Sequence, residues 1–297
     1  MLDFRMNTFI AVCQCLSYTK AAEQLHITQP AVSQHIHYLE QSYGVTLFQM
    51  QGRKIQLTAA GELLLQAATT IRHDDAYLRE RLRTAAGEKK KMTFGVTFTI
   101  GEFVIAGAIA KFISQNVDIS LKIVTANTRE LLAKLQNGEI DFAIMEGNFD
   151  KREVEALIYS RERFIGVCGP DMEVKNEAVT MEELLSQRLL IREEGSGTRE
   201  VFVKDLERRN LTAEDFAGVI EIGNMSAIKE LVKKNTGIAF LYEAAVKEEL
   251  AMGTICKIPI TDFDVSHDFS FIWNKGSIYK ERYQRLFYEL GGTLAGQ

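Results

Sequence analysis

Residues 17–40 read SYTKAAEQLHITQPAVSQHIHYLE. Their apolar side chains are spaced as on two short helices joined by a tight turn. Val32, Ile36 and Leu39 fall at i, i+4 and i+7, so they form one apolar stripe on the second helix. Thr28 is a natural N-cap for that helix, because its hydroxyl can accept a hydrogen bond from an unpaired first-turn N–H. The pattern predicts a helix-turn-helix, whose second helix enters the major groove of DNA.

The polar residues of the second helix face away from this stripe. Pro30 lies in the first turn, where its missing N–H costs nothing, and Ile27 is expected to plug the turn. Side chains of short and medium length can exchange hydrogen bonds with base edges. The alternative is an ordinary helix pair with a solvated polar face. The candidate DNA-contacting residues are Thr28, Gln29, Pro30, Ser33, Gln34 and His37.

A longer ordered pattern extends over the first 60 residues. It comprises Phe9, Ser17, Ala21-Ala22, Leu25, Thr28-Gln29-Pro30-Ala31-Val32-Ser33, Ile36, Leu39-Glu40, Gly44, Leu47-Phe48, Gly52-Arg53 and Leu57-Thr58-Ala59-Ala60-Gly61. The pattern resembles the DNA-binding domain of the LysR-type transcriptional regulators. The chain departs from that family at Met50, where an Arg is usual, and at Gln34 and His37, where Arg is frequent. These departures remove positive charge from the expected DNA face.

Two short apolar stretches, 45–48 and 55–57, predict the hairpin of a wing. Arg53 and Lys54 at its tip could reach phosphates or the minor groove. The alternative is a solvated turn. Residues 1–58 are therefore expected to form a winged helix-turn-helix domain.

A long helix is expected from about 59 to 86, capped by Thr58. The spacings along its apolar stripe alternate between three and four, with Asp74 as an interruption, as in a coiled-coil seam. A lone helix of this length with an unpartnered stripe would be poorly supported, so we expect it to dimerise. The linker helix of LysR-type regulators does the same. Residues 87–91 then break the helix and begin a hinge. The expected dimerisation residues are Leu64, Ala67, Ile71, Leu78 and Leu82.

Charge is divided unevenly along the chain. Residues 1–91 hold 11 Lys and Arg against 8 Asp and Glu, a net +3, whereas residues 92–297 hold 24 against 32, a net −8. A basic excess confined to the N-terminal part fits a DNA-binding domain attached to a separate sensing domain. Because +3 is small, useful affinity for double-stranded DNA should require several DNA-binding domains acting together.

From Met92 onward, strands and helices alternate, which is the order of an α/β fold with parallel sheets. The pattern predicts one lobe from 92–162 and 268–297 and a second lobe from 163–267, joined by two crossovers. This arrangement resembles the periplasmic-binding-protein-like effector domain of LysR-type regulators. Strands are expected at 92–98, 119–126, 140–146, near 158, 164–167, 189–192, 219–222, 237–241 and 267–273. Helices are expected at 101–114, 128–136, 198–209, 227–234 and 278–290.

Ligands of open α/β sheets bind at the carboxyl ends of strands, near helix N-termini. Three segments there combine small residues, hydroxyls and free N–H groups, which favour an anion. The alternative is that their hydroxyls only cap helices. The strings TIGE and GSGTR are also similar to those of a LysR-type subgroup linked with sulfur and carbon-fixation metabolism. The candidate effector-binding residues are Thr97, Thr99, Ile100, Gly101, Ser196, Gly197, Thr198, Asn224, Met225 and Ser226.

Two other classes remain open, an enzyme domain fused to a helix-turn-helix and a ligand-independent architectural DNA-binding protein. Against an enzyme, the effector half has a single histidine, His267, and no metal-ligand spacing. It also lacks GxSxG and GxGxxG motifs after a strand. The four cysteines are scattered, and Cys13 and Cys15 are expected to fill the core rather than bind zinc. We expect no cofactor and no metal.

No apolar run approaches the ~20 residues that a membrane span needs, and no signal peptide is legible, so a cytoplasmic protein is expected. The resemblance implies a homodimer that pairs into a homotetramer and bends DNA. It also implies contact with RNA polymerase, controlled by a small anionic metabolite that closes the cleft between the lobes.

Overall fold

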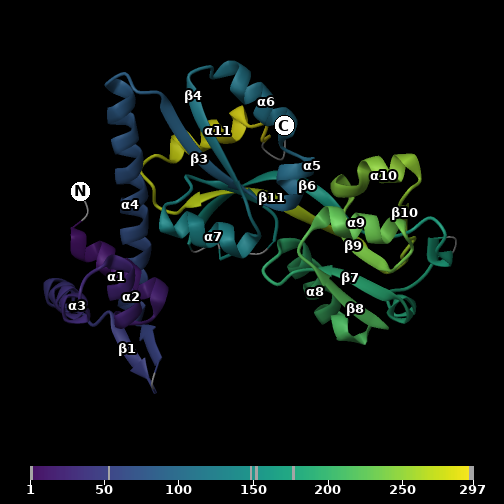
Figure 1. The fold of residues 1–297 in the computed structure, drawn as a ribbon, viewed down its shortest axis with the longest axis horizontal. Coiled ribbons are helices and arrows are strands. Elements are labelled where there is room, and N and C mark those ends of the chain that lie inside the picture. The colour runs from purple at the N-terminus through teal and green to yellow at the C-terminus, as the bar shows by residue number, and fades with distance from the viewer. Residues whose placement is uncertain (1–2, 53, 148, 151–152, 176–177, 294–297) are drawn as a thin grey trace.

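The computed structural model describes residues 3–52, 54–147, 149–150, 153–175 and 178–293. In Figure 1 the N-terminal domain lies at the lower left, the long helix rises from it, and the two-lobed remainder extends to the right. This is the architecture expected from the sequence. No helix in the described ranges has both the length and the apolar composition needed to cross a bilayer.

The N-terminal domain is built on three helices. Ser17 and Thr28 cap the second and third helices through their hydroxyls, as Thr28 was expected to do. The turn between them differs from the prediction, because Ile27 is 37% exposed and does not plug it. His26 instead adopts the left-handed conformation that ends the second helix, with φ of 54°. The helices are α1 (Phe4–Cys15), α2 (Tyr18–Leu25) and α3 (Gln29–Tyr43).

The wing is a short antiparallel hairpin of β1 (Phe48–Gln51) and β2 (Lys54–Leu57). Its first strand starts three residues later than predicted. The Leu47 N–H donates to the Glu40 carboxylate and the Leu47 carbonyl accepts from Thr58, so this residue is not free to pair across the hairpin. Arg53, predicted at the wing tip, lies outside the described residues.

The long helix α4 spans Ala59–Ala85 and is capped by Thr58, as predicted. Two of its faces differ sharply. Four residues of the predicted dimerisation stripe, from Ala67 to Leu82, are exposed in the single chain, with Ile71 52% and Leu82 63% exposed. Leu64 differs from the prediction, because it is half-buried against the core of the N-terminal domain. The buried residues of α4 are Gly61, Ala68, Thr69, Thr70 and His73, mostly small or polar. The exposed stripe remains available to a partner.

The first lobe pairs β3 in parallel with both β4 and β5. Where one helix was predicted over 101–114, the structure has two, because the N–H groups of Val104 and Ile105 both donate to the Ile100 carbonyl and end the first. Phe98, predicted in a strand, begins that helix. The elements are β3 (Lys90–Val96), α5 (Phe98–Phe103), α6 (Ala106–Gln115), β4 (Ile119–Thr125), α7 (Thr128–Asn137), β5 (Ala143–Met145) and α11 (Lys280–Glu289).

The second lobe pairs β7 in parallel with β8 and β9. Short 3-10 turns lie at Glu173–Lys175, Glu183–Ser186, Ala213–Asp215 and Glu243–Val246. The principal elements are β7 (Arg188–Arg192), α8 (Gly197–Arg208), β8 (Gly218–Ile222), α9 (Met225–Lys233), β9 (Ile238–Tyr242), α10 (Lys247–Met252) and β10 (Cys256–Lys257).

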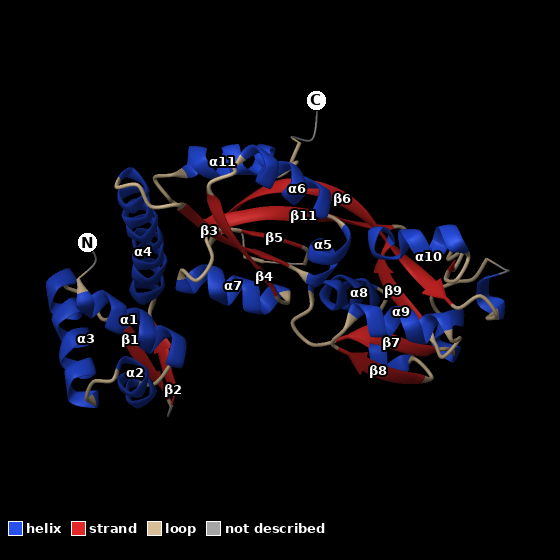
Figure 2. Ribbon diagram, turned by 45° about the horizontal axis from the view of Figure 1, so that its top comes forward, coloured by secondary structure: helices blue, strands red, loops and turns tan. Residues whose placement is uncertain are grey.

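Two long strands join the lobes. β6 (Val154–Cys168) is one strand where two were predicted, and it pairs antiparallel with β11 (Val265–Asn274), so the sheet is mixed rather than wholly parallel. At Phe164 the pairing of β6 passes on to β9. The strand order is β4-β3-β5-β11-β6-β9-β7-β8, with β10 beside β6. Figure 2 shows this sheet continuing from one lobe to the other.

Candidate functional site

The candidate DNA-reading surface is the outer face of α3. Gln29, Gln34 and His37 are exposed and Ser33 is half-buried, while Val32 and Ile36 lie in the domain core. The Gln29 amide donates to the Ser33 hydroxyl at 2.9 Å, and His37 Nε2 is 2.9 Å from the Gln41 amide nitrogen. These polar groups bond to one another along the helix and can exchange those partners for base edges.

This surface is weakly basic. No Lys or Arg occurs in α3, and Arg5, on neighbouring α1, pairs with Asp3 and stacks over the Tyr38 ring at 3.9 Å. On the wing, Met50 is 64% exposed and Lys54 is exposed. The structure therefore places the predicted reading residues together on the exposed face of α3, and Lys54 stands exposed on the wing.

The contact between the two lobes is organised around a buried carboxylate that was not predicted from the sequence. Glu146 follows β5 and is only 2% exposed. The Thr97 and Thr99 hydroxyls of the first lobe both donate to it, that of Thr99 at 3.1 Å. The Thr198 hydroxyl, from the second lobe, donates to the same carboxylate at 3.3 Å. Three predicted residues from two segments thus meet at one side chain.

One backbone hydrogen bond and a close glycine contact hold the two lobes together beside Glu146, whose carbonyl is bonded within the first lobe. The Thr128 hydroxyl donates to the Glu146 carbonyl at 2.8 Å, and the Arg129 N–H donates to the Gly195 carbonyl of the second lobe at 3.3 Å. Gly197 approaches so closely that a Cβ there would lie 2.5 Å from the Glu146 carbonyl oxygen. Glycine at 197 is therefore a requirement of this closed contact.

Two further buried polar groups belong to this region. Arg192 ends β7, is 3% exposed, and forms a two-point ion pair with Glu193 through Nε and Nη2, at 2.8 and 2.9 Å. Its Nη1 is buried and has no hydrogen-bond partner among the described residues. The same holds for the hydroxyl of fully buried Tyr242, the last residue of β9.

The electrostatics of the cleft centre on Glu146. Burial raises the pKa of its carboxyl, against the lowering effect of the Thr97 and Thr99 hydroxyls and of the Arg192 charge. Burial also raises the pKa of the Tyr242 phenol well above its usual value, and the Glu146 charge adds to that rise. Tyr242 therefore stays protonated at neutral pH and can donate a hydrogen bond.

The other predicted effector residues divide into three groups. Ser196 is buried at the start of α8, and its side chain makes no cap hydrogen bond. Ile100 lies in the hydrophobic core, and Gly101 packs beside Val96. The third predicted segment does not reach Glu146: Asn224 caps α9 through its carbonyl, Met225 lies in a core cluster, and Ser226 is exposed.

A sequence signal for the missed residues exists. Glu146, Arg192 and Tyr242 each stand at the carboxyl end of an apolar strand, in the strings DFAIME, LLIR and IAFLY. That is the edge at which ligand-binding groups collect in α/β sheets. The predicted hydroxyl residues at helix starts include the hydrogen-bond donors to Glu146. The strand-end residues Glu146, Arg192 and Tyr242 were not predicted.

The DNA-binding half is joined to the first lobe by a polar seam along α4. The Thr70 hydroxyl donates to the Lys275 carbonyl at 2.8 Å, and buried His73 bonds to the Leu135 carbonyl through Nε2. The Asp74 carboxylate accepts from the Ser277 hydroxyl at 2.6 Å, which explains the interruption of the apolar stripe. The helix ends at Ala85 and a turn leads into β3 at Lys90, within the segment predicted as a hinge. The helix and the first lobe are thus directly bonded.

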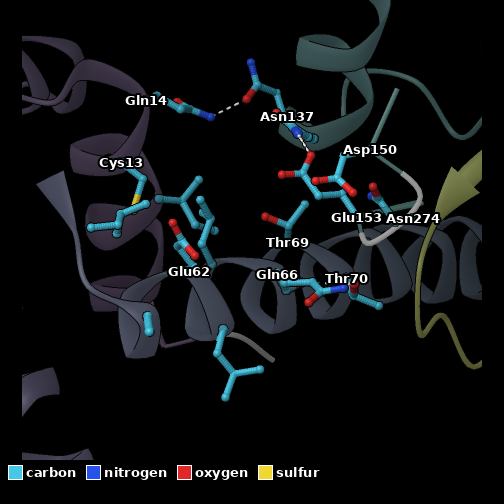
Figure 3. Close-up of a pocket in the computed structure, with 16 residues that line it drawn as sticks. Cys13, Gln14, Glu62, Gln66, Thr69, Thr70, Asn137, Asp150, Glu153 and Asn274 are labelled. Atoms are coloured by element: carbon cyan, nitrogen blue, oxygen red, sulfur yellow. Dashed lines mark hydrogen bonds between the residues drawn. The ribbon is translucent and has the colours of Figure 1, made fainter. Parts of the chain in front are cut away.

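A cavity of about 520 Å³ lies beside this seam, between α1, α4 and α7. Figure 3 shows Gln14 reaching across it to Asn137. The charged residues that line it are Glu62, Asp150 and Glu153. An acidic lining of this kind does not suit an anion, so the candidate effector site remains the polar contact between the lobes at Glu146.

Comparison with known proteins decides the family. The model for the bacterial regulatory helix-turn-helix protein, lysR family, matches residues 5–62, and that for the LysR substrate binding domain matches residues 85–293. The chain is a LysR-type transcriptional regulator. Like others of its family, it binds DNA through its N-terminal domain and a small-molecule effector through its C-terminal domain.

Two relatives of this LysR-type regulator align over most of both chains. The HTH-type transcriptional activator CmpR of Synechocystis sp. is 28% identical, over 91% of this chain and 88% of its own length. The RuBisCO operon transcriptional regulator of Allochromatium vinosum is 25% identical, over 92% and 89%. The sequence resemblance to a carbon-fixation subgroup is consistent with these relatives.

The fold of the LysR-type effector domain recurs in a solved structure, the Synechocystis CcmR regulatory domain in complex with 2-PG. It has a TM-score of 0.61 and 19% identity, and covers 67% of this chain and 95% of its own. At this identity the likeness concerns the fold.

Proposed function

We propose that this LysR-type regulator senses a small anionic metabolite in the cleft between its lobes and thereby changes how its DNA-binding domains fit their operator. The observation that carries the proposal is the meeting of both lobes at Glu146, beside the unpaired donors of Arg192 and Tyr242. A ligand that inserts there must alter the contact between lobes. It shifts the equilibrium to the extent that it prefers one arrangement.

The assembly we propose is a dimer held by the exposed stripe of α4, two of which pair into a tetramer that bends the DNA between two sites. Contact with RNA polymerase would then depend on that bend. The cytoplasmic location and the lack of catalytic activity belong to the same proposal. So do the domain limits 1–58, 59–91 and 92–297. The bound 2-PG of CcmR supports an anionic ligand for this fold.

The test is a thermal-shift screen of anions, including sulfate, phosphorylated sugars, dicarboxylates and sulfur-containing amino-acid precursors. A ligand of the native state raises the melting temperature by mass action. Thr99→Ala and Ser196→Ala should weaken the shift and the effector response while leaving operator binding in place. An unchanged response in both variants would place the effector elsewhere. A panel that never shifts the wild type would favour an architectural protein without a ligand.

A further inference from the structure

The contact between the lobes contains a mismatch of hydrogen-bonding groups that restricts the chemistry of a ligand. Arg192 Nη1 and the Tyr242 hydroxyl are buried donors without partners in the described part of the chain. Glu146 interacts electrostatically with both residues, and a carboxylate, when ionised, accepts hydrogen bonds and cannot donate one. A buried unpaired donor costs free energy comparable to a lost hydrogen bond, so both donors favour an incoming acceptor.

We infer that the effector is an anion that also carries a hydrogen-bond donor, with its negative group on Arg192 and Tyr242 and its donor on Glu146. This inference rests on the proposed function of the cleft. Glu146 is then a specificity-determining residue. A fully deprotonated anion of the same size would present only acceptors to the carboxylate, and two acceptors cannot form a hydrogen bond. Hydroxy acids, amino acids and oxyanions that retain a proton fit the class, whereas sulfate does not.

The capacity of Glu146 fits this role. Its Oε1 accepts from Thr99 and Thr198, and its Oε2 accepts from Thr97 alone. Two carboxylate oxygens offer about four acceptor positions, so at least one remains for a ligand.

Arg192 is prepared to hold the negative group. Glu193 occupies Nε and Nη2, which fixes the guanidinium plane and leaves Nη1 as its free end. The Phe98 ring of the first lobe lies 5.3 Å from the guanidinium carbon. The donor is thus positioned before a ligand arrives, and no rearrangement of Arg192 is needed to present it.

Within the described residues, the side-chain hydrogen bonds that Glu146 accepts come from threonine hydroxyls, and Arg129, another cation at this contact, lies against Gly195. Glu193 is an acceptor already paired with Arg192, and Glu162, which also acts on Tyr242, is a second carboxylate. Arg199 is engaged by Glu221 and the Arg192 carbonyl. The effector must therefore bring the donor itself.

Matched pairs of small anions test the inference on the full-length protein at pH 8. Phosphate, which keeps a proton there, is compared with sulfate, and glycolate with acetate. Isothermal titration or thermal shift should show phosphate and glycolate binding at least about tenfold more tightly than their partners, the value of one hydrogen bond to a charged group. Equal or reversed affinities within both pairs would overturn the inference, as would no binding of any of the four at tens of millimolar.

A variant reverses the chemistry of the acceptor. Glu146→Gln places an amide N–H beside the ligand. The affinities for sulfate and acetate should therefore rise relative to those for phosphate and glycolate, by a similar factor. Glu230→Gln, on the surface of α9, removes the same charge far from the cleft and should change nothing. An unaltered preference in Glu146→Gln would refute the role of Glu146.

The failure of the proposed function would look different. Arg192→Gln should abolish binding of all four anions if the cleft is the site. If Arg192→Gln binds them as the wild type does, the cleft assignment itself is wrong. If Arg192→Gln binds none of the four anions, while the wild type binds the two members of each pair with equal affinity, the assignment of the site is retained. Only the inferred ligand class is then refuted.

Discussion

Gly197→Ala should force the two lobes apart. The added Cβ would lie 2.5 Å from the Glu146 carbonyl oxygen and 2.7 Å from the Thr128 hydroxyl oxygen. Real Cβ contacts are not shorter than 3.0 Å, so the lobes must separate by at least about 0.5 Å. The hydrogen bond from Thr198 to Glu146, already 3.3 Å long, would then exceed the useful limit.

The magnitude follows from two opposing effects. Overpacking costs about 1–3 kcal/mol, and a weakened bond to a buried carboxylate costs about 1 kcal/mol or more. Because alanine is favoured over glycine in a helix by up to about 1 kcal/mol, the propensity term works the other way. We expect the free energy of unfolding of the effector domain to fall by about 1–3 kcal/mol.

The assay is denaturant unfolding of the full chain, combined with small-angle scattering to detect a more open effector domain. Gly107→Ala is the matched control, because a Cβ at this helical position of α6 meets nothing within 4 Å. It should be neutral or slightly stabilising. A Gly197→Ala protein as stable and as compact as Gly107→Ala would show that the lobes are not closed on Glu146 in solution.

Three further predictions concern the DNA-binding half and its attachment. The double variant Gln29→Ala, Ser33→Ala should reduce the difference in binding free energy between operator and random DNA by about 1–3 kcal/mol, measured by fluorescence anisotropy at fixed salt. An unchanged difference would refute the assignment of the outer face of α3 as the DNA-reading surface. Charged residues at Ile71 and Leu78 should give smaller species in light scattering, since both are exposed in the single chain; an intact oligomer would reject the α4 stripe. Burial lowers the pKa of His73 despite its bond to a carbonyl, so the unfolded state binds the proton more readily. The neutral form then stabilises the fold above the unfolded pKa of ~6.5, and this contribution is lost as pH falls from there towards the folded pKa. Replacing His73 with Asn should therefore weaken the dependence of the free energy of unfolding on pH over that acidic range. An equally steep pH dependence in the variant would show that His73 is not its origin.

Local periodicity was enough to predict three parts of the fold from the sequence: the helix-turn-helix, the linker helix and the two-lobed α/β order. Val32, Ile36 and Leu39 are all buried as their spacing required. The errors came where tertiary contacts decide. β6 looked like two strands, since Ser160 to Arg163 are polar, yet pairing with β11 carries it across both lobes. Ile27 is exposed, whereas Ala21 and Ala22 of the preceding helix are buried in the core.

The polar contact between the lobes was only partly predictable from the sequence. Thr97, Thr99 and Thr198 were chosen because their hydroxyls stand at helix starts, a local property, and the structure brings them to one carboxylate. Glu146 could not be predicted, since its burial depends on the second lobe, which brings Thr198 to it. Asn224 has the same local appearance and caps α9, and its role as an effector residue stays a prediction.

The polar seam along α4 restricts which parts of one chain can move independently. The helix is bonded to the first lobe through Thr70, His73 and Asp74, so these two parts share one orientation. If an effector moves the lobes as proposed, the second lobe is the part free to move relative to both. Under the proposed function, we therefore expect the effector signal to pass through a neighbouring subunit that contacts the second lobe, rather than along the α4 helix of the same subunit.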